Sequence, residues 1–214
     1  MDTMNRLARW LIVLAFGIAA HGDTLVIADF SSGDLSGWEA KAFAGETRYR
    51  RVRADGCTVL RAESDGSASG LVRRIRVDLT STPILNWSWR VDNTLADVDE
   101  HSKAGDYPAR LYVAVSGGVL FWRTRALNYV WSSHQPLGAS WPNAFTGNAR
   151  MLAVASGPAH AGEWRHYRRD VRADLRRLLD EDIDAIDAVA IMTDTDNSGQ
   201  HVIAYYGDIY FSTD

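Results

Sequence analysis

A polar turn near the end of the chain has the residue types of a cation-binding loop. Four residues follow the opening of a calcium loop, D-x-D-x-S-G: Asp194, Asp196, Ser198 and Gly199. Their oxygens, with the amide oxygen of Asn197, are ligands that Ca²⁺ prefers. The turn is not an EF-hand, because its twelfth position is Tyr205 rather than Glu and no helical pattern flanks it. The apolar runs on either side, Val189–Met192 and His201–Phe211, predict a β-hairpin with this turn at its tip.

Three interpretations of the turn stay open. It could bind a cation, with further oxygens from the Asp97–Asp106 loop or from Asp65. It could be an Asx-turn whose carboxylates accept backbone N–H groups. It could also contact a ligand or substrate directly. We therefore take as candidate ligand-binding residues Asp194, Asp196, Asn197, Asp106, His101 and Trp141, and as candidate metal ligands Asp194 and Asp196.

Two long polar loops supply the other candidates. Residues 92–106 contain His101 and Asp106, and a loop of this length in a compact domain is usually functional or disordered. Residues 132–148 contain Trp141 among Pro and Gly residues, which favours an exposed ring. Sugars present C–H faces that stack on aromatic rings, so an exposed Trp141 would suit a glycan. Core filling is the alternative for Trp141 and for the neighbouring aromatics Trp122, Tyr129 and Trp131.

The sequence contains no constellation for nucleophilic or zinc-dependent catalysis. There is no G-x-S-x-G elbow and no H-E-x-x-H spacing. The only cysteine, Cys57, opens an apolar run, and we expect it to be a small buried residue of a strand. A carboxylate pair for glycoside cleavage stays open, since no spacing singles one out. We therefore assign no catalytic residue.

Length and charge favour one domain without affinity for nucleic acid. The chain has 214 residues, enough for one sizeable core, and a formal net charge of −4. A mildly acidic domain gives no electrostatic reason to expect nucleic acid or anionic lipid as a partner. A single cysteine excludes an internal disulfide. No pattern indicates the oligomeric state.

Residues 1–22 have the pattern of a secretory signal peptide. Two arginines form a basic start, Trp10–Ala20 is an apolar run, and small residues precede a cleavage point near Gly22. The apolar run is shorter than the roughly 20 residues that a bilayer span needs. An uncleaved anchor is the alternative. We expect a periplasmic or secreted protein, not stably inserted in a membrane, with one domain over residues 23–214.

Short strands separated by turn residues dominate the rest of the chain. Apolar and polar residues alternate in Ile84–Val91, with Trp87 and Trp89 on the apolar face. Thr47–Arg53 suits an edge strand, and an apolar stripe within Val171–Leu179 predicts one short helix. Further strands are expected at residues 25–30, 57–63, 71–79, 111–115, 120–131, 151–155 and 164–171. The pattern predicts an all-β, jelly-roll-like antiparallel β-sandwich with one short helix.

Ordered motifs along the chain resemble one bacterial family. They are Trp87-Ser-Trp-Arg90, Lys103-Ala-Gly-Asp106, Ala109-Arg-Leu-Tyr-Val113, Asn128-Tyr-Val-Trp131, Gly162-Glu-Trp164, Ile191-Met-Thr-Asp-Thr-Asp-Asn197 and Ala204-Tyr-Tyr-Gly-Asp-Ile209. Together they are similar to the family known as domain of unknown function 3047. The resemblance implies an exported bacterial protein of one domain, and it brings no established activity with it.

The two ends of the predicted domain resemble those of jelly-roll carbohydrate-binding modules. The likeness is carried by Asp29-Phe-Ser-Ser-Gly33, Leu35-Ser-Gly-Trp38 and the closing Tyr205-Tyr-Gly-Asp-Ile-Tyr-Phe211. Such modules place their first and last strands side by side and often hold a structural calcium there. The resemblance implies Asp29 and Asp208 as calcium ligands in this chain.

Our leading hypothesis from the sequence is a non-catalytic module that binds a glycan-like or other small polar ligand, assisted by calcium. The alternative is a polysaccharide hydrolase or lyase on the same fold, with acids of the 97–106 loop facing the turn. A structural protein of the cell envelope is the third class.

Overall fold

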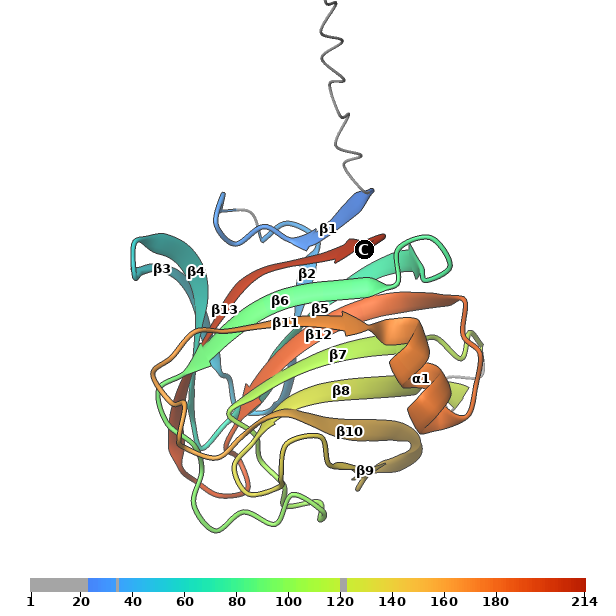
Figure 1. The fold of residues 1–214 in the computed structure, drawn as a ribbon. Coiled ribbons are helices and arrows are strands. Elements are labelled where there is room, and N and C mark those ends of the chain that lie inside the picture. Colours follow the sequence, from blue (N-terminus) through green and yellow to red (C-terminus); the bar gives the residue numbers. More distant parts are fainter. Residues whose placement is uncertain (1–22, 34, 120–122) are drawn as a thin grey trace, which may run out of the picture.

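The described part of the chain folds into two β-sheets that pack face to face, with one short helix at the side (Figure 1). The computed structural model describes residues 23–33, 35–119 and 123–214, so the predicted signal peptide lies outside the described residues. The all-β, jelly-roll-like sandwich predicted from the sequence is confirmed. Within the described ranges, no helix is long and apolar enough to cross a membrane.

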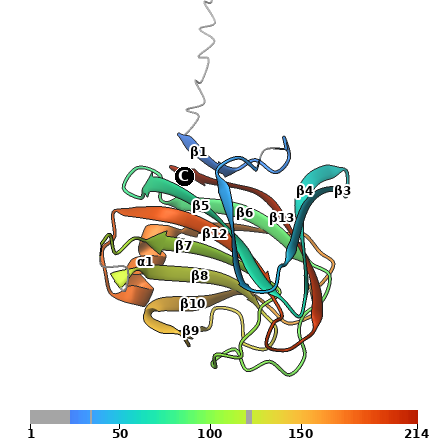
Figure 2. The same ribbon diagram turned by 180° about the vertical axis from the view of Figure 1, so that it is seen from behind.

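One sheet has six strands in the order β11-β6-β13-β4-β3, with β1 also paired to β13. These are β1 (Thr24–Ala28), β3 (Arg48–Ala54), β4 (Cys57–Asp65), β6 (Ile84–Val91), β11 (Arg165–Asp170) and β13 (His201–Ser212). The other has seven, in the order β2-β5-β12-β7-β8-β10-β9 (Figure 2). These are β2 (Trp38–Ala44), β5 (Ala68–Asp78), β7 (Ala109–Val115), β8 (Arg125–Ser132), β9 (Ser140–Asn143), β10 (Thr146–Ser156) and β12 (Ala185–Asp194). Only β8 and β10 pair in parallel among the described strands.

The last strand, β13, organises the six-stranded sheet. β6 runs along one edge of it, while β4 and β1 share the other edge. β4 pairs with residues 201–206 and β1 with residues 209–212. The change of partner falls at Gly207 and Asp208, where the register with β6 also shifts. β4 and β1 therefore diverge from each other beside these two residues.

Alternating apolar residues of the two sheets form the core. Leu85, Trp87, Trp89 and Val91 are at most 3% exposed, as the alternation along this strand predicted. The Trp87 ring packs on Tyr129 of the opposite sheet, with 5.2 Å between the ring centres. Such an aromatic pair contributes about 0.5–1.5 kcal/mol beyond the area that it buries. Core filling is thus the role of these rings.

The predicted helix is α1 (Val171–Leu179), which lies at the side of the sandwich (Figure 1). It begins after Asp170, whose carboxylate accepts a hydrogen bond from the N–H of Ala173 at 2.9 Å. Val171 and Leu175 are buried in the core. The apolar stripe therefore faces inward, as its spacing predicted.

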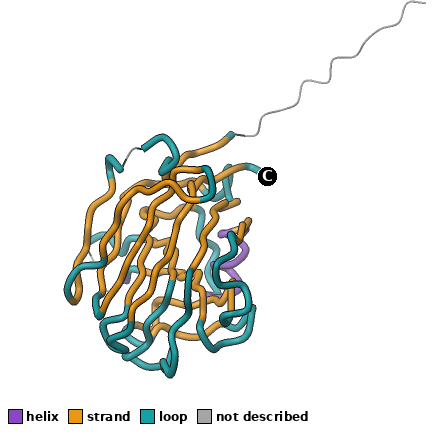
Figure 3. Tube along the Cα trace, turned by 90° about the vertical axis from the view of Figure 1, so that its left-hand side faces the viewer, coloured by secondary structure: helices purple, strands orange, loops and turns teal. Residues whose placement is uncertain are grey.

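The hairpin expected from Val189–Met192 and His201–Phe211 is wrong. β12 pairs with β5 and β7, whereas β13 belongs to the other sheet. The polar turn between them crosses from sheet to sheet at the end of the sandwich where many loops gather (Figure 3). It runs beside the β4–β5 turn, because Thr195 N–H donates to Ser67 O at 2.8 Å. Two apolar runs around a turn look alike in sequence whether they pair with each other or with distant strands.

Other local expectations have mixed outcomes. β3 is an edge strand, as predicted for Thr47–Arg53. Cys57 is exposed rather than buried, because it follows directly on the two-residue Asp55-Gly56 turn of the β3–β4 hairpin. The strand expected at residues 120–131 begins at Arg125, and residues 120–122 lie outside the described residues. The loop expected at residues 132–148 contains β9.

Candidate functional site

The 92–106 loop is held against the connection between β12 and β13. The side chain of Gln200 accepts a hydrogen bond from the N–H of Ala96 at 2.9 Å and donates one to its carbonyl at 2.7 Å. The side chain of Asn93 donates to the carbonyl of His201 at 2.8 Å. The long polar loop and the polar turn, distant in sequence, therefore contact each other at one end of the sandwich.

Three carboxylates converge where these segments meet, and we call them the acidic cluster: Asp106, Asp194 and Asp196. One oxygen of each lies within 4.8 Å of the others. Asp106 is 0% exposed and Asp194 2% exposed, while Asp196 lies nearer the surface. Arg110 supplies the guanidinium paired with Asp194. With up to three negative charges against this one positive charge, the cluster could hold a cation.

Asp106 fixes the polar turn from outside. One carboxylate oxygen accepts the backbone N–H of Ser198 at 2.7 Å, and the other accepts the side-chain amide of Asn197 at 3.0 Å. Hydrogen bonds to an ionised carboxylate are shorter and stronger than those between neutral groups. Asp106 of the 92–106 loop thus caps the backbone of the polar turn.

Asp194 forms a buried ion pair with Arg110 and also accepts the N–H of Tyr107 at 3.3 Å. The guanidinium lies 4.2 Å from the centre of the Tyr107 ring, a cation–π contact. Burial raises the pKa of Asp194 to about 7, against the opposing effect of Arg110, and the charge of Asp106 raises it further. Burial and the charge of Asp106 also raise the pKa of Asp196. The cluster therefore has a raised affinity for protons.

Trp141 does not present its ring to solvent, so the expected exposure is wrong. It is 4% exposed, and its indole N–H donates to the carbonyl of Glu100 at 2.9 Å. The carboxylate of Glu100 is itself buried and accepts the N–H of Ser133 at 2.6 Å. His101 is exposed, with its ring 5.4 Å from that of Trp141. These contacts anchor the 92–106 loop on the seven-stranded sheet. Trp141 and His101 do not belong to the acidic cluster.

Asp29 and Asp208 lie together but away from the acidic cluster. β1 pairs with β13, the arrangement of first and last strands that the resemblance implied. The Oγ of Ser31 is 3.0 Å from Asp29 Oδ1 and 2.6 Å from Asp208 Oδ2. Hydrogen bonds from Ser32 and Ser31 lower the pKa of Asp29. Asp208 lies roughly 20 Å along β13 from His201, where the turn ends. The two acids would therefore form a separate site.

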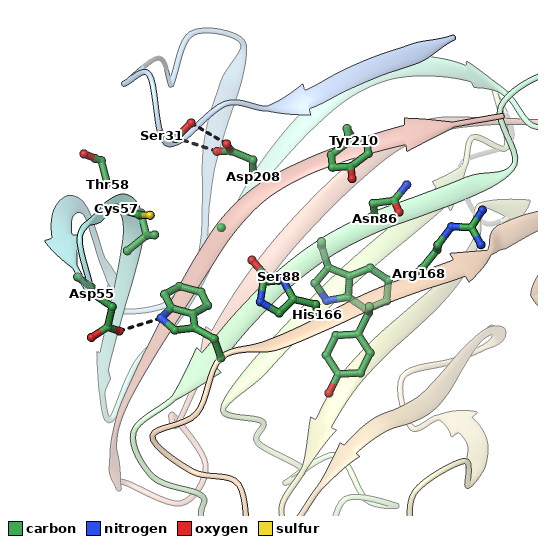
Figure 4. A pocket seen from close by; sticks show the side chains of 16 residues that line it. Ser31, Asp55, Cys57, Thr58, Asn86, Ser88, His166, Arg168, Asp208 and Tyr210 are labelled. Carbon is green, nitrogen blue, oxygen red and sulfur yellow. Dashed lines mark hydrogen bonds between the residues drawn. The ribbon is translucent and has the colours of Figure 1, made fainter. Parts of the chain in front are cut away.

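A groove of about 640 Å³ crosses the outer face of the six-stranded sheet (Figure 4). Register places its polar side chains in rows: His166 of β11 is opposite Ser88 of β6, and Arg168 is opposite Asn86. Asn86 is in turn opposite Tyr210 of β13. Side chains directly opposite on one face have Cβ atoms about 4.5–5.5 Å apart. One ligand could therefore contact three strands at once.

The walls of the groove come from the places where the sheet is interrupted. Asp208 faces it from the point where β4 and β1 diverge (Figure 4). A Cβ added at Gly207 would lie 2.3 Å from the Ser88 hydroxyl, so only glycine leaves that hydroxyl its position. At the other end, Asp55 of the β3–β4 hairpin accepts the indole N–H of Trp164 at 2.9 Å. The ring is thereby fixed at the groove's rim.

The acidic side chains of the groove accept hydrogen bonds from other residues, whereas several of its other polar side chains have no partner in the described ranges. Asp208 accepts the N–H of Ser31 at 2.9 Å, and Asp55 also accepts the Arg90 guanidinium at 2.6 Å. The side chains of Ser88, His166 and Arg168 make no hydrogen bond or ion pair with any described residue. The groove therefore offers free polar groups at its centre and β11 side.

Comparison with known proteins places the chain in a family. A family model described as Protein of unknown function (DUF3047) matches residues 36–210. The chain belongs to this family. No curated protein matches the sequence. Among solved structures, the chain is similar to a variant of a family 29 carbohydrate-binding module at 12% sequence identity and a TM-score of 0.41, over 89% of this chain and 92% of that chain.

The region matched by the DUF3047 family contains both features described above. It includes the acidic cluster and the groove residues of β6, β11 and β13. Asp29 and Ser31 precede the match. The resemblance seen in the ordered motifs is confirmed, and the family description leaves the ligand open.

Sequence reasoning missed the groove. Alternation put Asn86 and Ser88 on the polar face of their strand, but it could not say which strand lies alongside. In β11, His166 and Arg168 flank Tyr167, and that short alternation was the available signal. What the pattern lacked was the pairing of β11 with β6, which joins segments about 80 residues apart in the chain.

Proposed function

We propose that this member of the DUF3047 family is a non-catalytic module that binds a glycan or another small polar ligand in the groove of the six-stranded sheet. The observation that carries the proposal is a groove of about 640 Å³ in which the side chains of Ser88, His166 and Arg168 lack partners in the described part of the chain. Ligand sites typically have volumes of about 300–1,000 Å³ and a few polar groups that fix orientation.

The groove's chemistry suits a polyhydroxylated ligand. The Ser88 hydroxyl and the His166 ring can each donate or accept, as sugar hydroxyls do. Tyr210 is 38% exposed on the same face, and a sugar ring can lay its C–H face on such an aromatic ring. Trp164, fixed by Asp55, offers a second aromatic surface at the rim. Ordered cross-strand positions require little rearrangement on binding, which favours affinity.

The enzyme alternative has less support. It requires acids of the 97–106 loop to reach a substrate, yet Asp106 and Asp194 are buried and already bonded. Within the groove, Asp208 and Asp55 are each committed to protein donors. Glycoside cleavage needs one carboxyl group to protonate the leaving oxygen and another to act on the sugar. We therefore favour binding without chemistry.

We further propose that the acidic cluster binds calcium and thereby stabilises the contact between the 92–106 loop and the polar turn. Its donors are the carboxylates of Asp106, Asp194 and Asp196. Thermal unfolding in millimolar Ca²⁺, Mg²⁺ or chelator tests this. Ca²⁺ at about 100 times its Kd should add about 2.7 kcal/mol to the free energy of unfolding, and Asp196→Asn should reduce the effect. Identical unfolding in Ca²⁺ and in chelator would eliminate the calcium proposal.

The glycan proposal is tested by calorimetry against neutral and acidic oligosaccharides, using two aromatic variants. Tyr210→Ala removes a groove ring and should weaken binding at least tenfold. Phe145→Ala is the matched control, because Phe145 is 70% exposed but does not line the groove. Equal affinity in the Tyr210 variant and the wild type, or loss of binding in the control alone, would refute the groove as the site.

We also propose that the protein is exported and periplasmic, on the signal-peptide pattern of residues 1–22. The test is expression of the full chain in a Gram-negative host, fractionation, and N-terminal sequencing. The proposal expects a periplasmic protein that begins close to Asp23. An intact chain found only in the cytoplasm would overturn it.

A further inference from the structure

An arginine on β11, Arg168, distinguishes the groove from a neutral binding surface. β11 is the edge strand of its sheet, and His166 and Arg168 project from its outer face into the groove (Figure 4). Two other arginines of this sheet have acidic partners: Arg90 contacts Asp55 at 2.6 Å, and Arg61 contacts Glu63 at 2.7 Å. Arg168 has no such partner among the described residues. Its guanidinium is therefore free to bind an anion.

A second hollow adjoins the groove across β11. It has a volume of about 580 Å³ and shares His166, Tyr167 and Arg168 with the groove. Arg169 and Arg177 also line it, whereas none of the described residues that line it is acidic. The two hollows thus meet at β11, and Arg168 lines both of them.

Arg169 and Arg177 carry more positive charge than their one acidic partner can neutralise. Both bind one carboxylate, that of Asp174, at 2.5 Å for Arg169 and 3.2 Å for Arg177. The Asp174 side chain is 6% exposed, whereas those of Arg169 and Arg177 are 36% and 53% exposed. Two guanidinium groups therefore reach solvent over a single buried anion. The second hollow has a net positive lining.

We infer that the ligand is an anionic polysaccharide, which lies across β11 and places an acidic substituent on Arg168. This inference deepens the proposed glycan-binding function and rests on it. The planar fork of an arginine donates two parallel hydrogen bonds to a carboxylate or a sulfate ester. Sugar hydroxyls would contact Ser88 and Asn86 in the groove, and the chain would continue into the second hollow. β13 and β11 are two strand spacings apart, about 10 Å, so the ligand is larger than one sugar ring.

The test compares oligosaccharides of equal length that differ only in charge class: uronate, sulfated and neutral. Calorimetry measures their Kd for the wild type and for Arg168→Gln, which keeps most of the side chain and removes the charge. Arg74→Gln is the matched control, because Arg74 is 78% exposed on the opposite sheet and pairs with Glu39. We expect the wild type to prefer one acidic ligand over the neutral one by at least tenfold. Arg168→Gln should abolish that preference, and the control should retain it.

The outcomes separate the two levels of the proposal. Binding of the uronate or of the sulfated ligand, lost in Arg168→Gln and weakened by rising salt, supports the inference and identifies the acidic group. Equal or better binding of the neutral ligand, or an unchanged preference in Arg168→Gln, overturns the inference and leaves the glycan groove standing. Absence of binding to all three classes refutes the inference and glycan binding by the groove together.

Discussion

Replacing Asp106 by Asn should weaken the contact between the polar turn and the 92–106 loop. In the wild type, one carboxylate accepts both the backbone N–H of Ser198 at 2.7 Å and the side-chain amide of Asn197 at 3.0 Å. An asparagine at this position keeps one acceptor oxygen but turns an NH₂ group toward the other donor. One partly buried N–H is then left without an acceptor, and the remaining hydrogen bond loses its charge assistance.

The expected loss of stability is about 2 kcal/mol. Hydrogen bonds to charged groups contribute about 1.5–3 kcal/mol each, and the loss is partly offset because one negative charge leaves the acidic cluster. For a domain of this size, 1 kcal/mol corresponds to about 2–4 °C in Tm, so Asp106→Asn should lower Tm by roughly 4–8 °C. Urea unfolding at neutral pH measures the free energy directly.

A control variant in the same loop separates the loss of the Asp106 hydrogen bonds from the general effect of an Asp-to-Asn change. Asp97→Asn makes the same chemical change at an exposed position, and its φ of 53° is one that asparagine tolerates well. It should alter stability by less than about 0.5 kcal/mol. If the Asp106 and Asp97 variants are equally stable, capping by Asp106 does not hold the turn, and the account of this end of the sandwich is incorrect.

Three further predictions concern other charges and the groove. Because the pKa of Asp194 is raised to about 7, the folded protein binds more protons at this carboxyl than the unfolded protein does. The free energy of unfolding should therefore fall as pH rises from about 4 through 7, and Asp194→Asn should reduce this pH dependence. For Glu63 the pH dependence of stability has the opposite sign. A hydrogen bond from Arg61 lowers its pKa to about 2, so its contribution to stability is present above about pH 4.5 and lost as pH falls toward 2. Glu63→Gln should remove this loss at acid pH, as measured by urea titrations at several pH values. Gly207→Ala should displace the Ser88 hydroxyl and reduce glycan affinity while costing less than about 1.5 kcal/mol; unchanged affinity would show that this hydroxyl does not contact the ligand.

The fold could be predicted largely because the alternation of residues within one strand shows which side chains are buried. Trp87 and Trp89 alternate with Asn86 and Ser88, and that alternation alone defines an inner and an outer face. Similarly, the apolar stripe of α1 is complete within nine residues. Neither inference needs knowledge of which strand lies next to which.

The site was less predictable because it depends on pairing between distant segments. The turn at Asp194–Gly199 was correctly seen as polar and acid-rich, yet its partner strands lie in different sheets. Trp141 sits in a segment rich in Pro and Gly, which suggested exposure, but β9 carries its ring into contact with Glu100. The groove arises only where β11, β6 and β13 come side by side, and no local pattern encodes that neighbourhood.

The shared edge of β13 also sets the order in which the chain can fold. The first strand pairs with the last, Thr24 opposite Ser212, so closing this part of the sheet joins residues from the two ends of the domain. Contacts of such long sequence separation carry a large loop-closure entropy and slow folding. During synthesis, β1 has no partner until β13 has left the ribosome. A chain arrested before β13 would lack the central strand on which β1, β4 and β6 assemble, so the six-stranded sheet, and the groove on it, can form only after β13 has been synthesised.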